Sequence, residues 1–99
     1  IRSYGADYIT FTANKKSKPF SLRFEGQKDK RFRVGFILLS SKDNQVTGIV
    51  RLKPDAQNTV LFDAEGYGKK YDRIVMAVMC VDASVQEKEL VSYTYSAEN

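Results

Sequence analysis

Hydrophobic and polar residues alternate with a period of two along most of this chain. Phe20, Leu22 and Phe24, for example, are each followed by a polar residue. Such alternation is typical of β-strands that bury one face, and no segment shows the sustained apolar spacing of a helix. The pattern predicts seven strands: Tyr8–Ala13, Phe20–Glu25, Arg31–Ser40, Val46–Lys53, Asn58–Asp63, Ile74–Val81 and Leu90–Ala97.

The segments between the predicted strands carry the residues that favour turns. Asp43-Asn44, Pro54-Asp55 and the pair Gly66 and Gly68 are examples. Short strands at regular spacing with turns between them favour an all-β, antiparallel β-sandwich, like that of immunoglobulin or fibronectin type III domains. An open barrel or a fragment of a jelly roll also fits, because the pattern does not fix the order of the strands.

Two of the predicted strands depart from simple alternation. Ile74–Val81 is apolar on both sides, which predicts a strand covered on both faces. Leu90–Ala97 carries no charge, and we expect it to lie inside a sheet. At a sheet edge, the same strand would be able to pair with another chain or a neighbouring domain.

The composition indicates one globular domain covering residues 1–99. The chain has 99 residues, of which 42% are hydrophobic, with six Phe and six Tyr available for a core. It begins at Ile1 without Met or a leader-like segment, so we expect a piece excised from a larger protein. The longest apolar run, Ile74–Val81, is far shorter than the ~20 residues that span a bilayer, and no membrane insertion is expected.

The residue types that most enzymes depend on are scarce. The chain contains no His and one Cys, which leaves no imidazole base for a catalytic triad and too few ligands for a zinc site. It also lacks the glycine-rich phosphate-binding motifs and the nucleophile elbow. Cys80 lies within an apolar run and is interpreted as a small buried hydrophobe. We therefore predict a protein that is not an enzyme and uses no cofactor.

Carboxylates near the predicted turns leave two alternatives open. Asp63, Glu65 and Asp72 flank the glycine pair and would suit a pair of acids for glycoside hydrolysis or oxygen ligands for calcium. Asp43 and Asn44 offer a second set of oxygen ligands. Nothing in either set has the ligand spacing of an EF-hand loop. We interpret these residues as turn-forming and solvated charges, and predict no metal site.

Basic and aromatic residues are the candidates for recognition. The net charge is +4, from 16 Lys and Arg against 12 Asp and Glu, and it is interpreted as solubilising charge. No nucleic-acid-binding motif is present, so nucleic acid is not an expected partner. Tyrosine rings are flat surfaces on which a sugar ring stacks. The candidate binding residues are Tyr67, Lys69, Lys70, Arg73, Tyr93 and Tyr95.

Several segments together resemble a known type of domain. These segments are Tyr4–Phe11, Phe20–Gly26, Tyr71–Val78 and Tyr93–Ala97. Their order resembles the C-terminal β-sandwich appended to some secreted bacterial metallopeptidases and cell-surface proteins. The resemblance implies a non-catalytic accessory module, extracellular or at the cell surface, with the catalytic domain elsewhere in the parent protein. The chain departs from many such modules in lacking acidic calcium loops, and the resemblance carries over no functional residue.

Two functions follow as expectations from these observations. The first is a non-catalytic accessory or interaction domain of a larger extracellular bacterial protein, which contacts a neighbouring domain of the parent chain or a protein partner. The alternative is a carbohydrate-binding module that holds a glycan with exposed tyrosines such as Tyr67.

Overall fold

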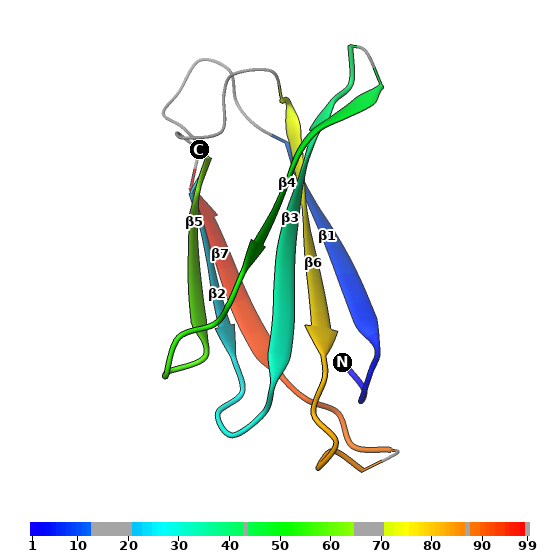
Figure 1. Ribbon diagram of the computed structural model, residues 1–99, viewed down its shortest axis with the longest axis vertical. Helices are drawn as coiled ribbons and strands as arrows, with labels where there is room; N and C mark the ends of the chain where they lie inside the picture. The colour runs from blue at the N-terminus through cyan, green and yellow to red at the C-terminus, as the bar shows by residue number, and fades with distance from the viewer. Residues whose placement is uncertain (13–20, 43, 65–70, 87, 99) are drawn as a thin grey trace.

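The computed structural model describes residues 1–12, 21–42, 44–64, 71–86 and 88–98. The described residues form strands and loops without a helix, so they include no helix that would span a membrane. Figure 1 shows the strands in two layers. The strands are β1 Ala6–Thr12, β2 Ser21–Gly26, β3 Phe32–Ser40, β4 Gln45–Leu52, β5 Thr59–Asp63, β6 Arg73–Cys80 and β7 Tyr93–Glu98.

The strands form two antiparallel sheets, which confirms the predicted β-sandwich. The four-stranded sheet has the order β1-β6-β3-β4, and the three-stranded sheet has the order β5-β2-β7. Two pairings, β2 with β5 and β3 with β6, are those of immunoglobulin domains. Three strands differ from the immunoglobulin constant type, because β1 lies beside β6, β4 lies beside β3 and β7 lies beside β2. The first and last strands have therefore exchanged sheets.

Aromatic residues join the two sheets. Phe36 of β3 stacks on Phe62 of β5 with ring centroids 4.3 Å apart. Phe24 of β2 meets Phe32 edge to face, at 5.4 Å between centroids. Burying one such side chain contributes about 1.5–3 kcal/mol. The buried apolar residues are Leu22, Phe24, Phe32, Val34, Phe36, Leu38, Val60, Phe62, Ala64, Ile74, Met76, Val78, Cys80, Val85 and Val91.

Polar contacts tie together the loops at one end of the sandwich. The Asp82 carboxylate accepts hydrogen bonds from the backbone N–H of Arg31 at 2.8 Å and from that of Ser84 at 2.9 Å. It also accepts one from the Ser84 hydroxyl. The Ser84 hydrogen bonds lower the pKa of Asp82 below its usual value. Asp82 thus holds the loop after β6 against the start of β3.

The last strand differs from the prediction in its start and in its place. β7 is an edge strand of the three-stranded sheet, so the expected interior position is wrong. It begins at Tyr93 rather than Leu90, because the preceding backbone has other partners. Val91 exchanges two backbone hydrogen bonds with Ile1, at 2.7 and 2.8 Å, and Ser92 accepts one from Gln27 at 2.9 Å.

The neighbours Phe62 and Leu61 on β5 provide a direct test of the core. Phe62 is buried and Leu61 is 67% exposed. Phe62→Ala removes the ring that stacks on Phe36, and we expect it to lower the free energy of unfolding by about 3–5 kcal/mol. Leu61→Ala is expected to change it by less than about 0.5 kcal/mol. Urea unfolding followed by circular dichroism measures both, and equal losses would contradict this assignment of the two faces.

Candidate functional site

The outer face of the four-stranded sheet, which points away from the other sheet, carries several apolar side chains. On β6, Val75, Ala77 and Met79 point outward and are half-buried, while the alternate residues are buried inside. The two described sheets leave this face without a covering strand. The expectation that Ile74–Val81 is covered on both faces is therefore wrong for the described chain. Its outward side chains are half-buried between the neighbouring strands β1 and β3.

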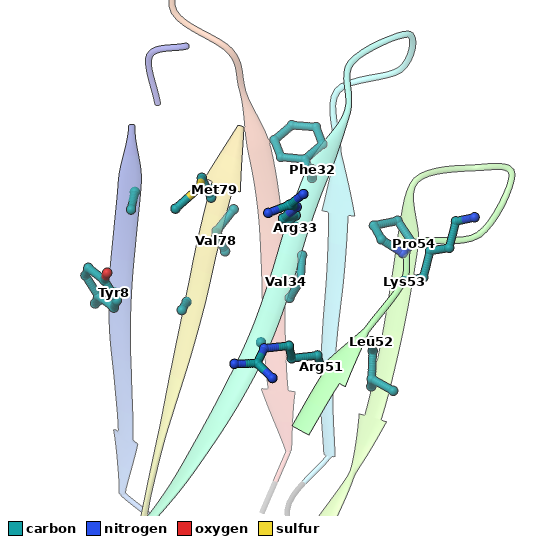
Figure 2. A pocket seen from close by; sticks show the side chains of 13 residues that line it. Tyr8, Phe32, Arg33, Val34, Arg51, Leu52, Lys53, Pro54, Val78 and Met79 are labelled. Carbon is teal, nitrogen blue, oxygen red and sulfur yellow. The ribbon is translucent and has the colours of Figure 1, made fainter. Parts of the chain in front are cut away.

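A single row of residues crosses this face from one sheet edge to the other. Tyr8 of β1 pairs with Ala77 of β6, Ala77 pairs with Gly35 of β3, and Gly35 pairs with Arg51 of β4. The two smallest side chains therefore lie between an aromatic ring and a guanidinium group. Figure 2 shows Tyr8 on the outer side of β1 and Arg51 extending from β4 across β3.

This row forms the floor and two ends of a groove with a volume of about 520 Å³. That volume falls within the range of small ligand-binding sites, roughly 300–1,000 Å³. The lining residues are Ala6, Tyr8, Phe32, Arg33, Val34, Gly35, Arg51, Leu52, Lys53, Pro54, Ala77, Val78 and Met79. None of these lining residues carries a carboxylate, thiol or imidazole.

Gly35 lies at the floor of the groove, where the fold has room for a Cβ atom. A Cβ at Gly35 would lie 3.6 Å from its nearest neighbour, the carbonyl oxygen of Val50, which is an ordinary contact. At Gly26, by contrast, a Cβ would lie 2.5 Å from the Phe32 ring. Glycine within a strand is destabilising, by about 0.5–1 kcal/mol relative to alanine. A side chain would therefore fit at this position, and the glycine leaves the floor of the groove open.

The charged residues of the groove are all cations. Arg33, Arg51 and Lys53 line it, and no Asp or Glu does. Within the described part of the chain, none of the three has an ion-pair partner. The groove therefore has a positive potential that is not neutralised by neighbouring described residues.

Apolar side chains continue along the sheet beside the groove. Ile37 of β3 lies between Val75 of β6 and Ile49 of β4 in the next row. Ile49 is 61% exposed, and Val46, paired with Leu39 one row further on, is 54% exposed. The groove and these rows form one continuous apolar face with cations at its margin.

The structure places the candidate residues from the sequence in three different settings. Tyr67, Lys69 and Lys70 lie outside the described residues. Arg73 is on β6, on the same face as the groove, where it pairs with Thr12 and Leu39. Its Nε atom lies 3.9 Å from Oδ1 of Asp72.

Tyr93 and Tyr95 share one side of β7 and face β1 across the gap between the sheets. The Tyr93 hydroxyl donates a hydrogen bond to Asp7 at 2.7 Å, and the Tyr95 ring meets Phe11 edge to face, with centroids 5.7 Å apart. Burial and the Asp7 hydrogen bond raise the pKa of Tyr93. Tyr93 therefore closes one side of the sandwich, and Tyr95 is partly packed against the same side.

The groove residues Tyr8, Arg33, Gly35 and Arg51 were not among the candidates from the sequence. The sequence contains one indication of these groove residues. Gly35 lies between apolar residues of its strand, and Arg33 shares a strand face with Ile37. The metal alternatives fall partly on Asp43 and Glu65, which lie outside the described residues. Among the residues whose positions are described, no group of three potential metal ligands occurs.

Comparison with known proteins finds no family model that matches the chain, and no similar curated protein or solved structure. The geometry and charge of the groove are therefore the basis for assigning a function.

The contact between Tyr93 and Asp7 gives a prediction about stability and pH. Tyr93→Phe leaves the Asp7 carboxylate without this donor, and we expect a loss of about 1–2 kcal/mol in the free energy of unfolding at pH 7. The folded protein holds the Tyr93 proton more tightly than the unfolded chain does. The free energy of unfolding therefore falls as pH rises above about 10, where the unfolded chain loses this proton. The Tyr93→Phe variant has no hydroxyl to ionise at this position and lacks this pH-dependent loss.

Urea unfolding of both proteins between pH 7 and pH 11 measures the two effects. The wild type is expected to lose more stability than Tyr93→Phe above pH 10, by up to about 1.4 kcal/mol per pH unit. Parallel stability curves over this range would show that Tyr93 has the same pKa in the folded and unfolded states, and would contradict the raised pKa.

Proposed function

We propose that this chain is a non-catalytic interaction domain that binds a protein partner through the outer face of its four-stranded sheet. The partner is a neighbouring domain of the parent chain or a separate protein. The observation that carries the proposal is the row Val75, Ile37 and Ile49, which continues the apolar groove across the sheet with no cover from the described chain. Apolar surface of this kind with a charged rim is typical of protein-binding sites.

The chemistry of the groove favours a protein over a neutral glycan. Tyr8 is its one lining residue with an exposed aromatic ring, and sugar-binding sites commonly stack sugar rings on such groups. The polar side chains of Arg33, Arg51 and Lys53 only donate hydrogen bonds. Hydroxyl groups of a sugar both donate and accept. A groove without a side-chain acceptor other than the Tyr8 hydroxyl suits apolar and anionic groups better than a sugar.

The positions of Tyr93 and Tyr95 also favour a protein partner over a glycan. Tyr93 donates to Asp7 between the sheets and is half-buried. Tyr95 contacts Phe11 with the edge of one ring against the face of the other. Neither residue lies in the groove. A carbohydrate-binding function therefore has less support from the described tyrosines than an interaction function has from the groove.

The cellular context of this proposal comes from the sequence. The resemblance to C-terminal sandwiches of secreted bacterial metallopeptidases and cell-surface proteins supports an accessory domain that acts outside the cell. In such a protein, the outer face of the four-stranded sheet would hold the domain against its neighbour, and catalysis would belong to the neighbour.

Site-specific crosslinking tests the proposed face. A photoreactive amino acid is placed at Ile49 on the four-stranded sheet, or at Leu61 on the three-stranded sheet, in the protein expressed in its source organism. Both positions are similarly exposed, at 61% and 67%. We expect a defined partner, or a neighbouring domain, to be crosslinked from Ile49 and not from Leu61.

Binding of the purified crosslinked partner then tests the assignment quantitatively. Ile49→Glu puts a charge into the apolar row and is expected to weaken binding at least about tenfold, as measured by calorimetry. Leu61→Glu is expected to leave the Kd unchanged. Equal crosslinking from both faces, or a Kd that Ile49→Glu does not alter, would rule out this face as the binding surface.

A further inference from the structure

We infer that the partner inserts a carboxylate-bearing side chain into the groove, over Gly35 and between Arg33 and Arg51. The inference rests on the proposed function and names the chemistry of the segment that is bound. The segment is an extended polypeptide in which an Asp or Glu and a branched apolar residue lie two positions apart. Three features of the groove lead to this segment.

The first feature is the segregation of charge. The chain as a whole carries 16 cations and 12 anions, yet the groove is lined by three cations and no anion. Described acids are engaged elsewhere, as Asp7 is with Tyr93 and Asp82 with Arg31 and Ser84. A partner that brings a carboxylate supplies the charge that Arg33, Arg51 and Lys53 lack among the described residues.

The second feature is the space above Gly35. The guanidinium of Arg51 extends from β4 across β3 (Figure 2), where Gly35 and Ala77 offer no side chain large enough to fill the floor. A guanidinium group is planar and binds a carboxylate with two parallel hydrogen bonds. Pro54 and Met79 add apolar surface to the lining of the groove. Partial removal of water strengthens such a pair.

The third feature is the spacing of the rows. Gly35 and Ile37 lie two residues apart on β3, which corresponds to about 6.8 Å along a strand. Alternate side chains of an extended partner have the same spacing. A partner carboxylate over Gly35 therefore places the partner's next side chain on that face over the apolar row of Val75, Ile37 and Ile49.

A second copy of this chain does not fit the same face. A two-fold contact through the groove would bring Arg33 and Arg51 of one copy against the same residues of the other. Like charges that face one another across a contact are destabilising. The occupant is therefore a different polypeptide surface, one that carries negative charge.

Selection from a random peptide library tests this specificity without knowledge of the natural partner. The purified domain is used to select 12-residue peptides by display, and the enriched peptides are measured by fluorescence anisotropy. We expect enrichment of Asp or Glu with an apolar residue two positions away. Replacing that acid by its amide is expected to weaken binding at least about tenfold, and added salt is expected to weaken it further.

Variants of the groove locate the bound peptide. Arg51→Ala is expected to weaken binding at least about tenfold, and Arg51→Lys, which keeps the charge without the planar fork, to weaken it less. Gly35→Val fills the floor and is expected to abolish binding. Because a β-branched residue suits a strand better than glycine, its melting temperature is expected to equal or exceed that of the wild type. Ser96→Val, on the three-stranded sheet, is the matched control and is expected to bind normally.

The possible outcomes separate this inference from the proposed function. Neutral apolar peptides that bind and are lost in Gly35→Val would overturn the carboxylate inference and leave the proposed function standing. Acidic peptides that bind Gly35→Val as well as the wild type would overturn the assignment to the groove. Failure to enrich any peptide, together with Gly35-dependent binding of polygalacturonate oligosaccharides, would overturn both and identify an acidic glycan as the ligand.

Discussion

The stacking of Phe36 on Phe62 fixes the two faces of the four-stranded sheet. Phe36 is buried against the opposite sheet, and neighbouring residues of a strand point to opposite sides. Gly35 and Ile37 must then point outward. Because strand pairing sets the register, the row from Tyr8 through Ala77 and Gly35 to Arg51 follows from that burial. A shift of one residue in β3 would invert both the core and the groove.

The two faces of this sheet differ in how far the described chain covers them. Inside, apolar side chains meet the second sheet, and Tyr93 and Asp7 close one side with a hydrogen bond. Outside, apolar rows and cations have no covering layer in the described chain. A glycine, which is unfavourable within a strand, lies in the groove on this outer face. We propose that a partner covers this outer face, which would account for its apolar rows, its cations and its glycine together.

Local alternation was enough to predict the strands and the sandwich, and not enough to predict the site. The pattern correctly predicts that Ile74–Val81 is apolar on both sides. It does not show whether another part of this chain or a different molecule covers the outward side chains. Tyr8 and Arg51 are joined in one row only by pairings between strands distant in sequence. The edge position of β7 likewise depends on strand order. Tyr93 was chosen as an aromatic candidate, and its contact with Asp7 could not be seen from its neighbours in sequence.

The two methionines provide the most direct test that the outer face is covered in its natural setting. Met76 is fully buried inside the sandwich, and Met79 lines the groove. Hydroxyl-radical footprinting with mass spectrometry measures the oxidation rate of each in the isolated domain and in the protein in its source organism. The interaction account predicts that Met79 is oxidised faster than Met76 in the isolated domain and is protected in the natural setting. Equal oxidation of Met79 in both settings would contradict it.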